Sequence, residues 1–529
     1  MSGKSIREAP WQALVMFILL SFLSGCTVGP DFTRPSVNVS QTWLEAADQR
    51  VKTESAETRT WWRVFDDPVL DQLIARAYRE NLSLKIAGVR VLEARAQLGI
   101  ATGGLYPQTQ QAFGSLQYNR VSERAPQALL NSNFNYWLSE IGLQAGWELD
   151  FWGKFRRAIE SANAHWLASI ANYDSALVSL TAGVANSYIT IRTLEKRLDI
   201  ARQNVETQKE SLKVTEARFQ YGTGSQLDVE QAKTALYNTL ASIPVLETQW
   251  RQAKDALSVF LGLPPTDLAD LLKDASEIPV SPAQVVMGIP ADLLRRRPDI
   301  RSAEQQAAAQ CAQIGVAKAD LYPAFSLTGN FGFLSSDVGN FKLSDMFQWK
   351  SRTAQTGPSF RWNILNYGQT RNNVRVQDAR LQELLITYQN AVLTAQQEVE
   401  DNLAAFLKAQ DQAGFLAQGV SAAKTSLDLA VLQYREGIVD FTTVLVAQQA
   451  LLNVQDSLAS TLGNISSSLV GVYRALGGGW EIREGKDLVS PEIKEEMRKR
   501  THWGKLLAPA SHNPPASEEP KSTLRLPDW

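Results

Sequence analysis

The chain has 529 residues, of which 44% are hydrophobic and 20% charged, and its formal net charge is −2. This composition belongs to an ordered protein with a sizeable core, and it excludes a disordered or collagen-like chain. The near-balanced charge gives no indication of a nucleic-acid partner. The mean hydropathy of −0.20 is typical of a chain that is not dominated by membrane helices.

The first residues, 1–25, predict a signal peptide. A short basic segment precedes an apolar run from Trp11 to Leu23. The run is shorter than the roughly 20 residues of a membrane helix and has the size of a secretory-signal core. It closes in Leu23-Ser24-Gly25-Cys26, which resembles a bacterial lipobox, so we expect cleavage before Cys26 and a lipid on its sulfur. Thr27 then favours outer-membrane delivery. An ordinary signal with an incidental cysteine is the alternative.

Two pairs of candidate strands follow the N-terminal region. Residues 26–65 lack periodicity and are expected to run as an extended segment over the outside of the folded body. A helix is predicted from about Pro68 to Gly104, interrupted near Asn81. Apolar and polar residues then alternate, as in membrane barrel strands of about 9–11 residues; a soluble sheet packed on helices is the alternative. Pro358 is expected to mark a strand start. The predicted strands lie at about 108–118, 136–147, 324–334 and 354–364.

Very long helices are the strongest signal. No proline lies between Pro126 and Pro244 or between Pro358 and Pro491. Apolar residues recur in both windows at steps of three and four, which indicates a narrow coiled-coil seam. The predicted helices, at about 154–219 and 369–436, would each be roughly 100 Å long at 1.5 Å per residue. Shorter helices return at about 226–262 and 440–476.

Two glycine-bearing turns join the long helices to the returning ones, at 221–225 and 437–440. Gly222 matches Gly437 (437 − 222 = 215), and Gly224 lies in the first turn. Trp147 and Trp362 match at the same offset. The chain is therefore a duplication, with repeats at 66–290 and 291–490, and a proline-bearing flexible tail is expected at 491–529.

Four strands per chain carry a consequence for assembly. Closed barrels have about eight strands or more, and an open sheet in lipid would leave edge groups unpaired. If the mature chain crosses a membrane through these strands, it must therefore form an oligomer.

Several distinctive segments lie along the chain: Cys26-Thr27-Val28-Gly29-Pro30-Asp31-Phe32, Trp61-Trp62, the two glycine turns, Trp147-Glu148-Leu149-Asp150-Phe151-Trp152-Gly153 and Leu293-Leu294-Arg295-Arg296-Arg297-Pro298-Asp299-Ile300-Arg301-Ser302-Ala303-Glu304. In these segments the chain resembles the TolC-like outer-membrane efflux family, in its NodT-type lipoprotein branch that serves RND-type pumps. The resemblance implies a mainly α fold with a transmembrane β part: a homotrimer with a twelve-stranded β-barrel that continues into a long periplasmic helical barrel. It also implies that the tips form the periplasmic entrance, where an adaptor (membrane fusion) protein and an inner-membrane RND-type transporter dock.

The expected function is a passive export duct for drugs or other small molecules, driven by the inner-membrane transporter. A type I secretion channel, a heavy-metal efflux channel and a lipid-tethered coiled-coil scaffold are the alternatives. We do not expect an enzyme, because no Walker loop or nucleophile elbow occurs. Three scattered histidines do not predict a metal site. The only expected covalent group is the lipid on Cys26.

The candidate gate lies at the tips. Arg218, Asp228, Arg435 and Asp440 would be repeated around the pore by the symmetry of the oligomer, where charge rings select ions and ion pairs favour closure. Helix capping is the alternative for the carboxylates, with Ser225 and Asp440 at the expected N-cap positions. Some members of the family carry an acidic residue where this chain has Val439.

Overall fold

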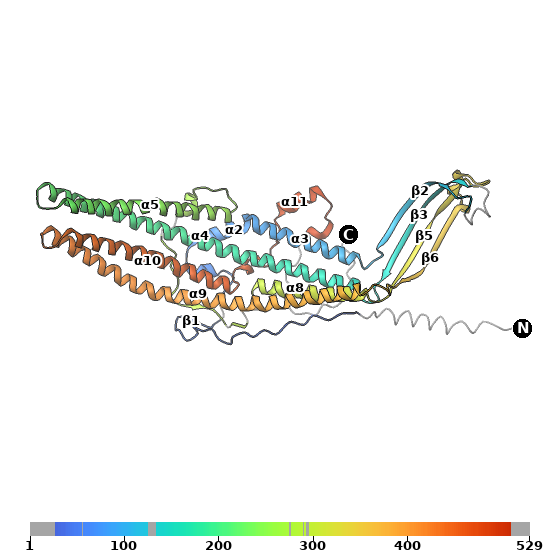
Figure 1. Ribbon diagram of the computed structural model, residues 1–529, viewed down its shortest axis with the longest axis horizontal. Coiled ribbons are helices and arrows are strands. Elements are labelled where there is room, and N and C mark those ends of the chain that lie inside the picture. Colours follow the sequence, from blue (N-terminus) through green and yellow to red (C-terminus); the bar gives the residue numbers. More distant parts are fainter. Residues whose placement is uncertain are drawn as a thin grey trace.

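The computed structural model describes residues 27–508, apart from 55–56, 125–133, 274–276, 289 and 292–295. The molecule is elongated, with two helical hairpins ending at one extremity and a β-sheet at the other (Figure 1). Among the described residues, no helix combines the length and the apolar character needed to cross a membrane. The predicted signal peptide 1–25 and the expected lipid site Cys26 lie outside the described residues.

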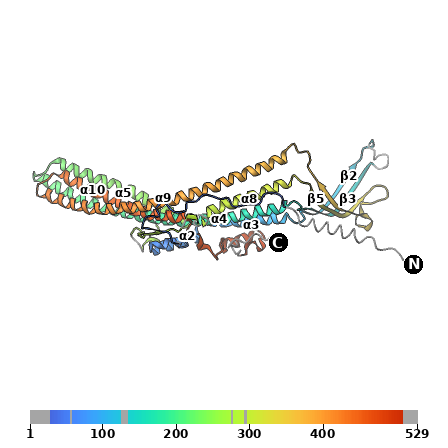
Figure 2. The ribbon, with the colours of Figure 1, turned by 90° about the horizontal axis from the view of Figure 1, so that it is seen from below.

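The long helices lie where the proline-free windows predicted them. Each pairs with a shorter returning helix, and the two resulting hairpins run side by side (Figures 1 and 2). Asn81 caps the second of the two N-terminal helices: its side chain accepts a hydrogen bond from the Leu84 N–H at 2.8 Å. The helices that build the body are α2 (Pro68–Glu80), α3 (Leu82–Gly103), α4 (Lys154–Gln220), α5 (Gln226–Phe260), α8 (Pro298–Ala319), α9 (Gln369–Arg435) and α10 (Phe441–Ala475).

The four predicted strands form one antiparallel sheet in the order β2-β3-β5-β6. The strands are β2 (Thr109–Arg120), β3 (Asn135–Leu149), β5 (Ala324–Ser336) and β6 (Arg352–Arg361). At the centre, Gly142 faces Gly332. A Cβ on Gly142 would lie 2.8 Å from the Phe331 carbonyl oxygen, so glycine lets β3 and β5 approach.

The position predicted for Pro358 was wrong. It lies inside β6, opposite Leu327, and does not mark a strand start. Because β6 is an edge strand of the described sheet, the missing N–H of proline can point away from β5 without loss of a ladder bond. The strand also ends at Arg361, three residues before the predicted end at 364.

The internal repeat is visible in the folded chain. The order α3, β2, β3, α4, α5 recurs as α8, β5, β6, α9, α10. Trp147 donates from its indole nitrogen to the Leu105 carbonyl at 3.1 Å, and Trp362 donates to the Leu321 carbonyl at 3.1 Å. Each long helix begins after a left-handed glycine, Gly153 (φ 77°) or Gly368 (φ 84°). The junction between sheet and helices is therefore built twice from the same contacts.

The N-terminal segment lies along α8 and α9 (Figure 1). Gln396 and Glu400 on α9 accept hydrogen bonds from the backbone N–H groups of Ser40 (3.1 Å) and Leu44 (3.0 Å). The segment is less uniform than the sequence indicated. It contains β1 (Val51–Lys52), which pairs in parallel with β4 (Val285–Val286), and the 3₁₀ helix η1 (Trp61–Phe65).

The main core lies at the middle of the body. Trp61 of η1 stacks on Tyr473 of α10 with ring centroids 5.5 Å apart, and the indole is 1% exposed. Short elements lie in two places: α6 (Ala269–Leu272) and η5 (Trp480–Arg483) pack on this core and form what we call the belt, whereas η3 (Leu343–Phe347) and η4 (Trp349–Ser351) lie against β5 of the sheet.

The predicted flexible tail 491–529 needs correction over its first part. Residues Pro491–Arg500 form helix α11, and Gly504–Leu507 form η6, which lies against α3. The apolar side chains of Met497 and Leu507 are buried, and Lys494 donates to Asp487 and to the Leu507 carbonyl. These contacts anchor a segment whose charge and prolines alone indicated disorder. Residues 509–529 lie outside the described chain.

Candidate functional site at the hairpin tips

The first tip is closed by backbone hydrogen bonds and a capping box. Gly222 has φ 73°, which ends α4. The N–H groups of Thr223 and Gly224 then donate to the Arg218 carbonyl at 2.8 and 3.0 Å. Ser225 Oγ accepts from the Asp228 N–H at 3.1 Å, and Asp228 Oδ2 accepts from the Ser225 N–H at 3.3 Å. The Asp228 carboxylate therefore takes part in the capping box of α5, which is the helix-capping role that the sequence offered as the alternative to a gate.

The second tip has the same backbone turn without the side-chain cap. Gly437 has φ 76°, and the Ile438 N–H donates to the Gln433 carbonyl at 2.9 Å. Asp440 occupies the N-cap position of α10, but its side chain makes no capping hydrogen bond. Among the described residues, neither Asp440 nor the exposed Arg435 takes part in an ion pair. These two charges face solvent.

Arg218 joins the two tips. Its guanidinium donates to the Tyr434 carbonyl of α9 and lies 4.6 Å above the centre of the Tyr434 ring. A weaker bond of 3.4 Å reaches the Thr223 carbonyl. Tyr434 packs in turn against Phe441 at the start of α10, with ring centroids 5.4 Å apart. One arginine thus ties the end of α4 to the α9–α10 turn.

Tyr434 was not among the residues predicted for the gate. It matches Phe219 in the repeat, but Tyr434 is 6% exposed and Phe219 is 44% exposed. Burial raises the pKa of the Tyr434 hydroxyl, and the nearby Asp228 charge raises that pKa further. The hydroxyl is buried without a hydrogen-bond partner. An aromatic residue beside each glycine turn was the only sequence signal for this contact.

Val439 is half-buried and packs against an apolar cluster under the second tip. The members at its centre are Tyr434, Phe441 and Val444. The position therefore supports the turn in this chain. In contrast, several large apolar side chains at the tips are open to solvent: Phe219 (44%), Tyr221 (84%), Leu227 (64%) and Ile438 (70%).

Above the tips, polar pairs connect the two hairpins. They join α4 to α10, whose residues lie some 240 to 260 positions apart, so no local pattern indicated them. Small residues allow the helices to approach: a Cβ on Gly463 would lie 2.2 Å from Thr193 Oγ1. The pairs are Arg197–Asp456 (2.7 and 3.0 Å), Asn204–Gln455 (3.2 Å) and Ser211–Gln448 (2.6 Å), which we call the polar seam.

Arg297 connects three helices around the start of α8. Its guanidinium donates to Asp299 (2.7 and 3.1 Å), to Glu398 of α9 (2.9 Å) and to the Ala475 carbonyl at the end of α10 (2.7 Å). Side-chain exposure of Arg297 is 9%. The arginine-rich segment noted in the sequence therefore has a structural role that its spacing alone did not reveal.

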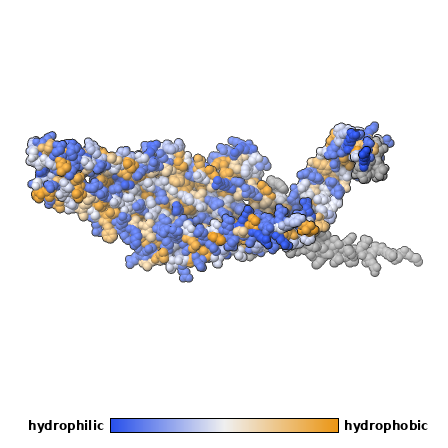
Figure 3. Space-filling view, in the orientation of Figure 1, coloured by the Kyte–Doolittle hydropathy of each residue, from blue (hydrophilic) through white to orange (hydrophobic). Residues whose placement is uncertain are grey.

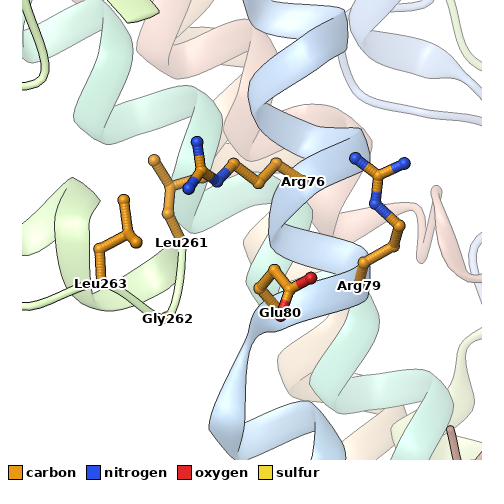
Figure 4. Close-up of a pocket in the computed structure, with 6 residues that line it drawn as sticks. All are labelled: Arg76, Arg79, Glu80, Leu261, Gly262 and Leu263. Carbon is orange, nitrogen blue, oxygen red and sulfur yellow. The ribbon is translucent and has the colours of Figure 1, made fainter.

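A cavity of about 360 Å³ lies near the belt. It lies between the last turn of α2 and the end of α5, and Figure 4 shows Arg76 reaching across Leu261 while Arg79 points away from Glu80. A Cβ on Gly262 would lie 2.5 Å from the Glu80 carbonyl oxygen. The hollow is thus a packing junction between two helix ends, and it is separate from the tips.

The family model described as "Outer membrane efflux protein" matches residues 73–263 and 289–478, one match to each half. This chain belongs to the outer membrane efflux protein family. Nodulation protein T of Rhizobium leguminosarum bv. viciae is 32% identical over 467 residues, which cover 88% of this chain and 93% of that protein. The toluene efflux pump outer membrane protein TtgC of Pseudomonas putida is 31% identical, covering 90% of this chain and 97% of its own.

Solved efflux-channel structures agree with the fold of this family member. The outer-membrane channel OprN superposes with a TM-score of 0.79 at 32% identity, covering 86% of this chain and all of that chain. The Campylobacter jejuni CmeC outer membrane channel superposes with a TM-score of 0.78 at 26% identity, covering 89% and 98%. The chain is thus an outer-membrane efflux channel with a periplasmic helical extension, and its relatives are channel proteins and not enzymes.

Proposed function

We propose that three copies of this chain form one passive duct from the periplasm to the cell exterior. The observation that carries the proposal is that one chain combines a four-stranded sheet, which is too small to close on itself, with two helical hairpins of roughly 100 Å. In the described sheet, β2 and β6 have no partner on their outer edges. Large apolar side chains on its strands are exposed in the single chain, among them Leu143 (63%) and Phe360 (71%). Three copies would place each edge strand beside an edge strand of a neighbour in a twelve-stranded closed sheet, in which Pro358 of β6 donates no bond across the new ladder.

The internal repeat supports a specific contact between neighbouring copies. Within one chain, Trp152 stacks on Tyr322 with ring centroids 4.7 Å apart. The repeat counterparts are Tyr367 for Trp152 and Tyr106 for Tyr322. Tyr367 is fully exposed in the single chain. We therefore propose that Tyr367 stacks on Tyr106 of the neighbouring copy. The same aromatic contact would then recur within and between the three subunits.

The tips are the proposed docking site for a periplasmic adaptor protein and an inner-membrane RND-type transporter. Exposed apolar side chains at Tyr221 and Ile438 offer contact area, and the open charges of Arg435 and Asp440 surround them. The same end would hold the gate. Arg218, held by Tyr434, would keep the two hairpins together, and Asp228 would act through the cap of α5. Val439 would act as packing beneath the turn.

A lipid on Cys26 would anchor the chain beside the sheet. The next residue, Thr27, lies against Gly153, where an added Cβ would be 2.7 Å from its side chain. The Val28 N–H donates to the Trp152 carbonyl at 3.0 Å. Residues 27 and 28 thus lie at the junction of sheet and helices, which supports a lipid on the preceding cysteine that enters the membrane beside the sheet.

Exported compounds are proposed to be small organic molecules, including antibiotics. The relatives named above include a toluene efflux pump protein, and the pyoverdine export outer membrane protein OpmQ of Pseudomonas aeruginosa is 32% identical over 441 residues. Deletion in the native host followed by a susceptibility panel tests the substrate class. Conductance in planar bilayers and heat-sensitive trimer bands on gels test the duct. A water-soluble monomer without conductance overturns the proposal.

A further inference from the structure

The junction between sheet and helices exists twice in each chain, and the two copies differ in charge. Residues 147–160 contain three cations and three carboxylates, whereas the matching residues 362–375 contain two arginines and no carboxylate. The formal net charge is therefore zero in the first copy and +2 in the second. Because the backbone and the tryptophan contacts are shared, the difference comes from the side chains and not from the fold.

In the first copy every cation has a carboxylate within the chain. Arg156 donates to Asp150 at 3.0 Å, Lys154 contacts Asp320 at 2.8 Å, and Arg157 contacts Glu160 at 2.8 Å. Asp150 and Glu160 belong to the junction itself and Asp320 comes from the end of α8, so this junction is neutralised within the chain.

In the second copy the matching partners are gone. Leu365 stands where the first copy has Asp150, and Arg375 stands where it has Glu160. Arg371, the counterpart of Arg156, and Arg375 are both exposed. Neither forms an ion pair with a described residue, and Asp378, three positions from Arg375, forms none with it. Arg375 donates to the uncharged side chain of Asn372 at 3.0 Å, so both cations lack a carboxylate partner among the described residues.

Apolar side chains lie beside these arginines. Trp362 (53% exposed), Ile364 (71%) and Leu365 (83%) continue from the end of β6 toward α9. In Figure 3 hydrophilic residues gather on the body where α9 begins, with a hydrophobic group next to them toward the strands. An aromatic and aliphatic border next to cations is the composition of a lipid headgroup interface.

Helix geometry places Arg371 on the outside of the proposed duct. Arg371 precedes Gln396 by 25 residues, which is about seven turns, so both lie on one face of α9. Gln396 holds the N-terminal segment, which begins next to the lipid site. Arg380 follows Arg371 by nine residues, or about two and a half turns, and so lies on the opposite face.

The distance from the sheet is short enough for electrostatic attraction. Arg371 and Arg375 lie about 3 and 9 Å along α9 from its start at Gln369, at 1.5 Å per residue. Both are within roughly one Debye length, about 8 to 10 Å, of the start of α9, which residues 362–368 join directly to the end of β6. An anionic surface attracts a nearby arginine with about a fivefold gain in binding constant.

We propose that the second junction, consisting of Trp362, Ile364, Leu365, Arg371 and Arg375, binds the headgroup of an anionic phospholipid in the periplasmic leaflet. The proposal rests on the proposed function, since the sheet must lie in the membrane. Three copies would give three such sites around the duct. The first junction, in which Asp150 takes the place of the lipid anion, binds none.

The test counts lipids retained by the purified full chain. The protein is reconstituted with equal amounts of phosphatidylglycerol and phosphatidylcholine, extracted in mild detergent, and weighed by native mass spectrometry. Wild-type protein is expected to retain phosphatidylglycerol preferentially. The double variant Arg371→Gln/Arg375→Gln should lower that preference by about 25-fold, because each of the two arginines contributes about fivefold.

Two further variants sharpen the result. Leu365→Asp keeps both arginines and gives Arg371 an internal carboxylate, as in the first junction, so the preference should also fall. Arg380→Gln, on the opposite face of the same helix, should keep the wild-type preference. An unchanged preference in either junction variant, or an equal loss in Arg380→Gln, overturns the proposal.

Channel conductance separates this proposal from the duct itself. All three variants are expected to conduct as wild type does in planar bilayers, because none lies at the tips. If the variants conduct but retain lipid equally, only the lipid site is wrong. If wild-type protein retains phosphatidylglycerol but does not conduct, the duct is wrong and the lipid site stands.

Discussion

Replacement of Arg218 by alanine should loosen the two tips and open the duct. The arginine makes one charged hydrogen bond to the Tyr434 carbonyl and one cation–π contact at 4.6 Å. A charged hydrogen bond contributes about 1.5–3 kcal/mol and a half-exposed cation–π contact about 0.5–1 kcal/mol. Because Arg218 is half-buried, the lower ends apply, and about 2 kcal/mol per subunit is expected.

That free energy corresponds to about a 30-fold change in the equilibrium between joined and separated hairpins in each subunit. The assay is single-channel conductance in planar bilayers, together with uptake of an antibiotic too large for ordinary porins. Arg218→Ala should raise the open fraction and the uptake. Arg218→Lys should lie between it and wild type, because an ammonium keeps the charge but loses the planar fork of donors.

Tyr434 supplies the matched control. Tyr434→Phe removes a hydroxyl that has no hydrogen-bond partner and keeps the ring, so it should behave as wild type. Tyr434→Leu removes the ring and should resemble Arg218→Ala in direction with a smaller effect. Wild-type conductance and uptake in Arg218→Ala would refute the role of this contact in closure.

Three further predictions follow from the fold. Arg297→Ala should destabilise the protein by about 3–5 kcal/mol, because it leaves Glu398 and the buried Ala475 carbonyl without their partner. Thermal unfolding measures this loss, and the control Arg296→Ala, at an exposed neighbouring position, should show none. Gly437→Ala should cost about 1–2 kcal/mol at its φ of 76°, whereas Gly414→Ala inside α9 should be neutral or stabilise by up to about 1 kcal/mol in the same melts. Cysteines at Tyr106 and Tyr367, in a Cys311→Ser background, should be joined between copies by a short thiol cross-linker and give dimers and trimers on gels. The pair Trp152 and Tyr322 should be joined only within one chain; intermolecular bands from that pair alone would contradict the assigned interface.

The long helices and the duplication could be predicted because their signals are local or repeated. A seam at steps of three and four, uninterrupted by proline, determines α4 and α9 almost to the residue. Pro358 was misplaced because the sequence does not say which strand lies at the edge of a sheet. The helix at 491–500 was missed because its stability comes from the burial of Met497 and Leu507 against α3, not from its own charged composition.

The tip contact could be predicted only in part. The glycine turns and the Ser225 cap follow from residue type, since few residues adopt a left-handed backbone or cap a helix. The bond from Arg218 to Tyr434 joins residues 216 positions apart and depends on how two hairpins pack. The same holds for Arg297, whose partners lie 101 and 178 positions away.

The polar seam between α4 and α10 has a thermodynamic consequence. Its contacts are an ion pair and amide or hydroxyl hydrogen bonds, so separating these pairs hydrates polar groups. Polar exposure lowers the heat capacity, whereas apolar exposure raises it. These pairs should therefore offset part of the heat-capacity increase that comes from exposing apolar residues such as Leu212 and Leu451, so that the free energy of opening is closer to linear in temperature.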